Sequence, residues 1–186
     1  SEFQKIQIDP KRIKHLFLTH LDTDHAGGMD SSGRILFPEA QVYMDAEEMR
    51  YMTGDVRRKG IFHNCVHIAD GWTPIKGNED FEVEGIKVEA IPVPGHTVGH
   101  TVYVVDDKII VSGDCLAVND NGGYAFFDFF TQDPPRNKKS LAALKEKLKG
   151  YSLEYVCTGH SGMHPYSEQI FAHIDESAVF GKAAPF

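Results

Sequence analysis

The chain has 186 residues, of which 41% are hydrophobic and 25% are charged, and these proportions are ordinary for a globular protein. This length suits one domain with a sizeable core, and we expect a single domain over residues 1–186. The formal net charge of −8 argues against binding to nucleic acid or to anionic membrane surfaces, because both roles need a basic face.

The first half of the chain is predicted to alternate between short helices and short strands. Asp9 and Pro10 are typical of a helix cap and a first helical residue, and the apolar run that follows them is typical of a buried strand. Glycine and proline recur between residues 53 and 80, which we therefore predict to be mostly loop. In this half we expect helical segments at residues 10–14, 24–30 and 45–52, and strands at residues 14–19 and 41–44.

The second half contains the clearest strand and helix patterns. Asp106-Asp107 is predicted to be a tight turn between two β-branched segments. Leu141, Leu144 and Leu148 recur at helical spacing. We expect strands at residues 85–93, 101–105, 108–112 and 154–157, a loop at residues 119–123, and helices at residues 137–149 and 165–180. The alternation of strands and helices predicts an α/β layered fold.

Metal-binding side chains are concentrated in the run Thr19-His20-Leu21-Asp22-Thr23-Asp24-His25. Imidazole nitrogens and carboxylate oxygens are the ligands that hold zinc, iron or manganese. Three glycine-containing segments further along the chain offer more of them, namely residues 94–100 with His96, 112–114 with Asp114, and 158–162 with His160. Each segment follows an apolar strand, so we expect these side chains at the carboxyl ends of strands, where α/β sheets present their sites.

Taken in order, these motifs resemble those of the metallo-β-lactamase superfamily, which carries HxHxDH, a GHTxGH-like segment, GD and a final GH. The resemblance covers most of the chain and implies a four-layer αβ/βα sandwich with two divalent metal ions, zinc first and iron or manganese as alternatives. It also implies the ligands. The first metal would take His20, Asp22 and His96; the second would take Asp24, His25 and His160; Asp114 would bridge both.

Two features depart from the family pattern. Asp22 stands where the family has its second histidine, so the motif here is HxDxDH. A third carboxylate moves the metal preference toward iron or manganese, and the alternative is that the first metal is weakly held and the second site works alone.

The second departure is the short segment before His20. The family's amino-terminal strands are expected to be missing, through truncation or because a partner chain or an amino-terminal fragment supplies them, and Ser1 to Phe3 are interpreted as residues left by cloning. An uncovered sheet edge is an aggregation hazard, so we expect a partner or a homodimer contact to cover it.

The function implied by the resemblance is hydrolysis of a small ester, thioester, lactone or lactam by a metal-bound hydroxide at a dinuclear site, with Asp24 orienting the nucleophile. Two alternatives stay open. One is an iron redox enzyme of the same fold, such as a sulfur dioxygenase or a flavodiiron-like protein. The other is a metal-binding subunit without catalysis. The expected partner is a small-molecule substrate, with no nucleic acid and no membrane.

Structural roles are expected for most of the remaining candidate residues. His100 is expected to support the site rather than to bind metal, and Cys115 to be a buried strand residue. The aromatic residues between Tyr124 and Phe130 fit a pocket wall and a core equally well, and Tyr124 could assist at an oxyanion. His63, Cys65 and His67 are interpreted as loop or strand residues. The odd number of cysteines and the lack of a signal peptide or long apolar run lead us to expect a cytoplasmic protein.

Overall fold

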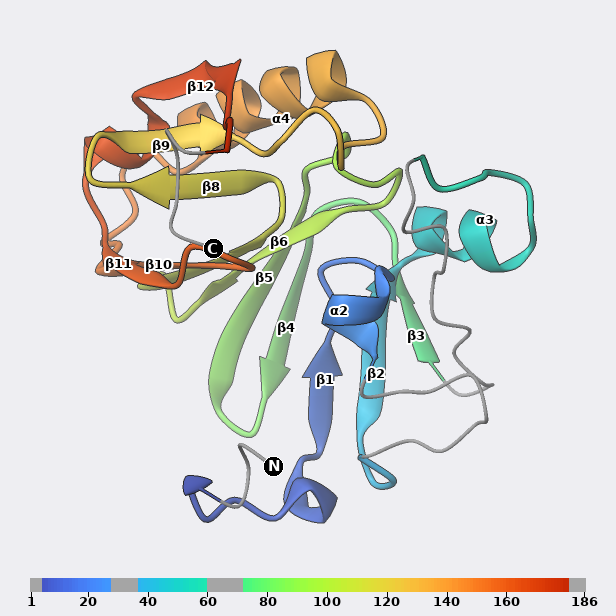
Figure 1. The fold of residues 1–186 in the computed structure, drawn as a ribbon. Helices are drawn as coiled ribbons and strands as arrows, with labels where there is room; N and C mark the ends of the chain where they lie inside the picture. The colour runs from blue at the N-terminus through green and yellow to red at the C-terminus, as the bar shows by residue number, and fades with distance from the viewer. Residues whose placement is uncertain (1–4, 28–36, 60–71, 181–186) are drawn as a thin grey trace.

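The computed structural model describes residues 5–27, 37–59 and 72–180, which fold into three β-sheets and a small number of helices (Figure 1). The first sheet is parallel, in the order β1-β2-β3, and consists of β1 (His15–Phe17), β2 (Gln41–Asp45) and β3 (Trp72–Ile75). No helix in this described part of the chain is long and apolar enough to cross a membrane.

The second sheet has six strands in the order β11-β10-β7-β6-β5-β4. Its strands are β4 (Glu79–Val83), β5 (Ile86–Pro92), β6 (Thr101–Val105), β7 (Ile109–Gly113), β10 (Tyr155–Thr158) and β11 (Met163–Pro165). The third sheet has the order β12-β9-β8 and consists of β8 (Leu116–Asn119), β9 (Gly122–Ala125) and β12 (His173–Ser177). The helical segments are η1 (Pro10–Arg12), α2 (Thr23–Ala26), η2 (Ala46–Glu48), α3 (Met49–Met52), α4 (Pro134–Lys147) and η3 (Glu168–Phe171).

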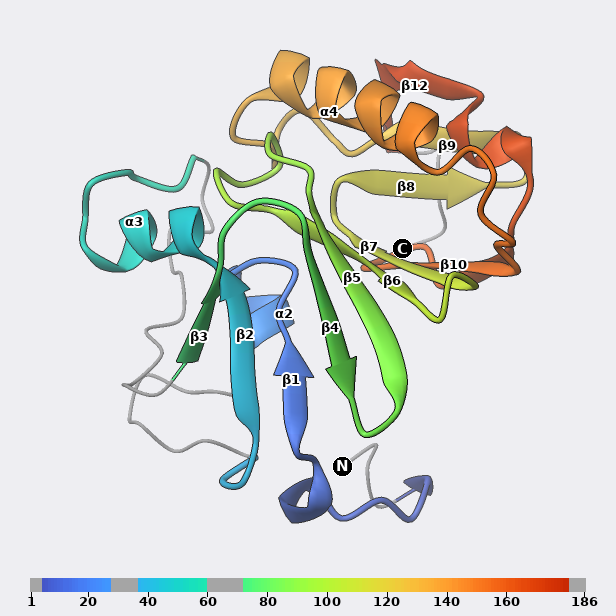
Figure 2. The same cartoon turned by 180° about the vertical axis from the view of Figure 1, so that it is seen from behind.

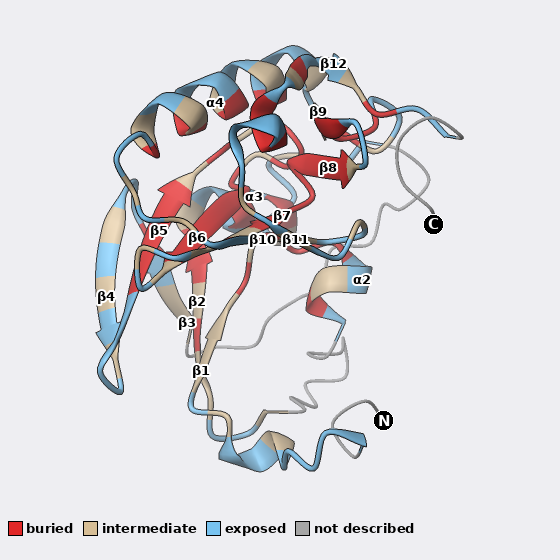
Figure 3. Ribbon diagram, turned by 90° about the vertical axis from the view of Figure 1, so that its left-hand side faces the viewer, coloured by how far each residue is buried: buried red, intermediate tan, exposed pale blue. Residues whose placement is uncertain are grey.

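The central strands β5, β6 and β7 of the six-stranded sheet are largely buried. Successive side chains along a strand point to opposite sides, so these strands contribute to packing on both faces. On β6, Tyr103 faces the first sheet, where it stacks edge-on against Phe17 of β1 with ring centroids 5.3 Å apart. Its neighbours Val102 and Val104 face the other way and belong to the core that contains Leu141 of α4. Figure 3 shows the result: β5, β6 and β8 are largely buried, whereas β4 is exposed at the sheet edge. The layers are therefore, in order, the first sheet, the six-stranded sheet, and the third sheet together with α4.

The carboxyl ends of β1, β5, β7 and β10 meet where the first sheet approaches the six-stranded sheet. The Thr101 amide donates to the Thr19 carbonyl (2.9 Å), and the Gly159 amide donates to the Gly113 carbonyl (3.1 Å). α3 lies beyond the end of β2, as Figure 2 shows from behind. These backbone bonds tie together the loops that carry the motifs of interest.

Most expected elements are present, and the differences have physical causes. The loop prediction at 53–80 was wrong for β3 and for the start of β4, which pair with β2 and β5. The loop predicted at residues 119–123 is part of the β8–β9 hairpin. α4 begins at Pro134, earlier than residue 137, because Asp133 caps it and two prolines fit its first turn. The helix predicted at 165–180 is wrong: after η3 the chain forms β12, which pairs with β9.

Candidate metal centre

The seven predicted ligands come together at the junction of the two sheets. His20, Asp22, Asp24 and His25 lie in the segment that leaves β1 and enters α2; His96, Asp114 and His160 follow β5, β7 and β10. Groups whose ligand atoms all lie within 4.8 Å of one another are His20, Asp22 and His96; His20, His25 and Asp114; and Asp24, His25 and His160. We call His20, Asp22 and His96 the first group, and Asp24, His25 and His160 the second group. Asp114 lies between the two groups.

The second group is arranged as ligands of one cation would be. The Nε2 atoms of His25 and His160 lie 3.2 Å apart, and both face Asp114 Oδ2, at 3.1 and 3.0 Å. Asp24 Oδ2 lies 3.3 Å from His160 Nε2. Ligands held tetrahedrally at about 2.0–2.1 Å from zinc lie about 3.3–3.4 Å from one another. These separations, together with an Asp114 Oδ1 that is buried and lacks a hydrogen-bond partner, fit a bound metal ion.

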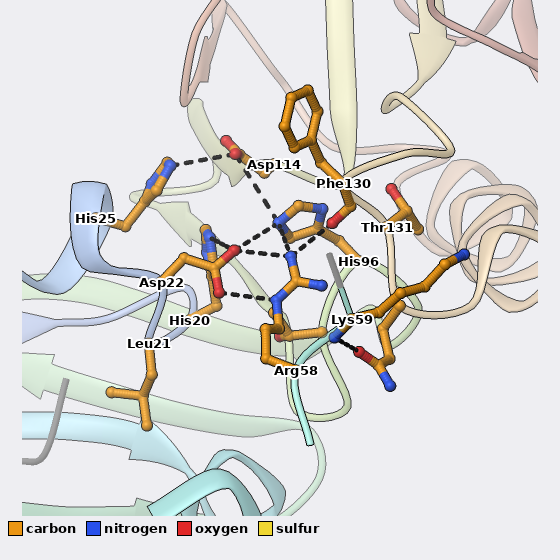
Figure 4. A network of polar contacts seen from close by, with 12 residues as sticks. His20, Leu21, Asp22, His25, Arg58, Lys59, His96, Asp114, Phe130 and Thr131 are labelled. Atoms are coloured by element: carbon orange, nitrogen blue, oxygen red, sulfur yellow. Dashed lines mark hydrogen bonds and ion pairs between the residues drawn. The ribbon is translucent and has the colours of Figure 1, made fainter. Parts of the chain in front are cut away.

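The first group differs because a charged side chain already lies inside it. Arg58 Nε donates to Asp22 Oδ1 at 2.8 Å, and Arg58 Nη2 donates to Asp22 Oδ2 at 2.7 Å (Figure 4). The same Nη2 lies 3.2 Å from His96 Nε2 and donates to the Phe130 carbonyl at 2.6 Å. Arg58 is only 5% exposed. Two ligands of the first group, Asp22 and His96, therefore contact a guanidinium, whereas the third, His20, has a buried Nε2 without a hydrogen-bond partner in the described part of the chain.

A family model described as the metallo-beta-lactamase superfamily matches residues 1–160. The chain belongs to the metallo-beta-lactamase superfamily.

Individual relatives within the superfamily are distant. The "Beta-lactamase-like protein 2 homolog" of Drosophila melanogaster is 26% identical over 85% of this chain and 48% of its own length. A "Hydroxyacylglutathione hydrolase" of Dictyostelium discoideum is 25% identical over 86% of this chain and 52% of its own length. The chain thus spans about half the length of these relatives.

The fold is also found among solved structures. A metallo-beta-lactamase family protein from Thermus thermophilus superposes with a TM-score of 0.64 at 19% identity, covering 92% of this chain and 62% of that one. The chain therefore has the αβ/βα sandwich fold of the superfamily, as its motifs predicted. Superfamily members use divalent metal ions, and the second group supplies a candidate site for one.

Burial and ion pairing set the charge states of the centre. Burial opposes ionisation of Asp22, but the hydrogen bonds from Arg58 outweigh it and hold the Asp22 pKa well below its usual range. Burial likewise opposes ionisation of Asp114, and the hydrogen bonds from His160 and His25 again prevail, so its pKa is lowered. Burial lowers the pKa of His20 well below its usual value. Asp22, Asp114 and His20 are therefore in the forms that bind metals, whereas the hydrogen bond to Asp114 raises the pKa of His160, and the same carboxylate outweighs burial to raise the pKa of His25.

Two buried side chains support the ligand loops without joining them. His100 Nε2 accepts a hydrogen bond from the Asp114 amide at 3.1 Å, which agrees with the supporting role expected for it. Glu48 accepts hydrogen bonds from the Leu21 amide (3.1 Å), from the Gly99 amide (2.8 Å) and from the Thr97 hydroxyl. Burial raises the pKa of Glu48 to about 7, against these hydrogen bonds. One carboxylate thus connects the loop after β1 to the loop after β5.

A cavity of about 300 Å³ opens beside the second group. Its apolar wall is formed by Phe126, Phe130 and Phe180, and its polar wall includes Asp24 and Lys59. Phe126 and Phe127 are nearly perpendicular, with centroids 5.2 Å apart, and both are buried in a small aromatic core. The aromatic run therefore serves both as a pocket wall and as a core.

Other sequence candidates lie elsewhere or act differently. Tyr124 stacks on His173 with ring centroids 4.8 Å apart and is not among the residues that line the cavity, so the alternative of an oxyanion role for Tyr124 has no support. Cys115 is fully buried, as expected, and burial raises the pKa of its thiol. His63, Cys65 and His67 lie outside the described residues.

Sequence reasoning missed Arg58 and Glu48. Neither belongs to a ligand motif, and Arg58 lies in a segment predicted to be featureless loop. The only available signal was Asp22 itself, a carboxylate in a place where the family has an imidazole and therefore one that needs a positively charged neighbour when buried.

Proposed function

We propose that this chain carries a zinc-dependent hydrolase centre for a small ester, thioester, lactone or lactam with an apolar acyl part. The convergence of Asp24, His25, His160 and Asp114 beside an aromatic-walled cavity is the observation that carries the proposal. The name of the Dictyostelium relative, a hydroxyacylglutathione hydrolase, supports the thioester within this class. The proposal centres on the second group, because the first group contains a guanidinium.

The metal ion, when bound, supplies Lewis acidity to the substrate carbonyl and to the attacking water. Asp24, His25, His160 and Asp114 would hold it, since their neighbouring ligand atoms lie 3.0–3.3 Å apart. The side chain of Asp24 is 59% exposed and lines the cavity, so it is placed to orient water and to accept its proton.

The cavity walls provide the substrate contacts. Phe126, Phe130 and Phe180 offer an apolar surface for an acyl chain and keep bulk water away from the scissile bond. Lys59 is exposed at the same cavity and can attract an anionic leaving part. We therefore expect the best substrates to combine a medium apolar acyl chain with a negatively charged leaving group.

The test is a panel of matched esters, thioesters, lactones and lactams assayed with protein purified without added metal, whose metal content is first measured by elemental analysis. We expect zinc, activity toward at least one class, loss of activity with a chelator, and recovery with zinc. Asp24→Asn should lower kcat by about 10²–10⁴-fold, whereas Asp120→Asn, in the exposed β8–β9 turn, should not. A zinc-loaded protein that hydrolyses no member of the panel contradicts the proposal, and bound iron with oxygen consumption would favour the redox alternative.

A further inference from the structure

We propose that the Arg58 guanidinium takes the place of the first metal ion, so that this protein binds one divalent metal, at the second group. Figure 4 shows the guanidinium pointing into the space between Asp22 and His96, with both carboxylate oxygens of Asp22 engaged. The inference rests on the proposed function in one respect only, namely that the second group binds metal.

Two of the three side chains that would coordinate a first metal, Asp22 and His96, are already hydrogen-bonded to Arg58, and the buried His20 Nε2 beside them has no hydrogen-bond partner among the described residues. A guanidinium has only donors, so His96 Nε2 must be the acceptor in its 3.2 Å contact with Arg58 Nη2. The lone pair of that nitrogen and a lone pair of Asp22 Oδ2 are therefore directed at Arg58 rather than at a cation. A metal could bind there only after Arg58 had left both ligands.

Charge and geometry make Asp22 and Arg58 a matched pair. Arginine stays protonated in proteins and pairs with a carboxylate through two parallel hydrogen bonds, which is the arrangement seen here at 2.8 and 2.7 Å. The histidine that the family has at this position could not form such a fork. A divalent cation beside the guanidinium would be repelled, and a buried Asp22 without Arg58 would be an uncompensated charge. The departure at Asp22 is thus explained by Arg58.

The main chain around Arg58 is also fixed to the loop that carries His96. The Lys59 amide donates to Gln132 Oε1 at 2.6 Å, and Gln132 Nε2 donates to the Arg57 carbonyl at 3.2 Å. The Gln132 amide in turn donates to the His96 carbonyl at 2.9 Å. Arg58 therefore belongs to the wall of the centre and is not a surface side chain that has folded inward.

The experiment counts metal ions by elemental analysis after dialysis against zinc, and by cobalt titration followed through visible absorbance. The wild-type chain should bind one ion. Arg58→Met, which frees Asp22 and His96, should bind two and show a second step in the cobalt titration. Arg57→Met makes the same substitution at the neighbouring exposed arginine and should still bind one ion.

The outcomes separate this inference from the proposed function. Two ions in the wild-type chain overturn the inference and leave the hydrolase proposal intact, whereas no ion in the wild-type chain contradicts both. A count of one in Arg58→Met shows that arginine is not what excludes the first metal and overturns the inference. If Arg58→Met does not fold, Arg58→Gln keeps a neutral donor toward Asp22, and the wild-type count still decides between one ion and two.

Discussion

The Asp114 carboxylate fits its place only because residue 159 has no side chain. A Cβ atom built on Gly159 would lie 1.9 Å from Asp114 Oδ1 and 2.6 Å from His25 Cε1. Real Cβ contacts are not that short, so either the carboxylate or the loop after β10 would have to move. A glycine at this point of the backbone is therefore a requirement for the second group.

We predict that Gly159→Ala reduces zinc affinity by at least about tenfold, which corresponds to about 1.4 kcal/mol, since the displaced carboxylate faces both His25 and His160. Isothermal titration with zinc measures the change directly. Gly162→Ala is the matched control in the same segment: its φ of +85° makes alanine strained, but nothing lies within 4 Å of the added Cβ. It should cost about 1–2 kcal/mol of folding stability and leave zinc affinity unchanged. Equal zinc affinity in the two variants would contradict the argument.

At the residue scale the sequence predicted which side chains gather at the centre, because ligand chemistry restricts the residue types and each type stood in a recognisable motif. It did not predict Arg58, which is 36 positions from Asp22 and carries no motif. A buried ion pair between distant residues depends on how two loops fold together, and composition or spacing does not encode that. The sequence therefore left two interpretations of Asp22 open: it binds the first metal, or it leaves the first metal weakly held.

At the scale of elements, Glu48 connects two ligand loops that are distant in sequence. It lies at the end of η2, fully buried, and accepts from the Leu21 amide after β1 and from the Gly99 amide after β5. Leu21 lies between His20 and Asp22, and Gly99 closes the turn that carries His96. The position of η2 therefore influences the first group through the backbone rather than through a ligand.

Glu48→Gln is predicted to destabilise the protein by about 1–3 kcal/mol, because its amide nitrogen must face at least one of the backbone donors and leave it unsatisfied. Chemical denaturation measures the loss. Glu47→Gln is the control, since the neighbouring Glu47 is exposed and forms a surface pair with Arg50; it should change stability by less than about 1 kcal/mol. A Glu48 variant as stable as the Glu47 variant would show that the buried carboxylate does not join the loops.

The loss of folding stability caused by Glu48→Gln should also depend on pH. The pKa of this carboxyl rises from 4.5 to about 7 on folding, so the stability that its protonation contributes is complete below pH 4.5 and is lost as the pH rises through 7. Asp22 and Asp114 have lowered pKa values and contribute in the opposite sense at acid pH, but they are present in both proteins. The difference in unfolding free energy between wild type and Glu48→Gln should therefore be larger at pH 5 than at pH 8.

Helices and strands were predicted correctly where the local sequence pattern agrees with the tertiary structure. The prediction failed where pairing with a distant strand determines the conformation of the segment. α4 was predictable because Leu141 and Leu144 mark a buried stripe, and both are in the core. β12 was predicted as helix because residues 173–177 carry no strand alternation, yet they pair with β9 in the third sheet. β3 was hidden by Pro74, which the parallel edge strand tolerates beside β2.

At the scale of the whole molecule, the second group and Asp114 come from both of the sheets that meet at the centre. Asp24 and His25 belong to the segment after β1 in the first sheet, whereas Asp114 and His160 follow β7 and β10 in the six-stranded sheet. An ion held by all four would cross-link the two layers. It would also neutralise carboxylates that otherwise stand close together, so metal binding and folding should be coupled.

We predict that removing the metal with a chelator lowers the unfolding free energy and the melting temperature, and that zinc restores both. Zinc present at a thousandfold excess over its Kd should add about 4.1 kcal/mol, because the unfolded chain does not hold the four ligands together. Differential scanning calorimetry at several zinc concentrations measures this, and the melting temperature should rise with the logarithm of zinc concentration. His160→Asn should remove most of the zinc dependence, since its Nε2 lies 3.0 Å from Asp114. His164 lies on the neighbouring strand β11, and its side chain contacts the Ser161 carbonyl, so His164→Asn should retain the full zinc increment. If the His160 and His164 variants respond equally to zinc, the stabilising ion binds outside the second group and does not cross-link the two sheets there.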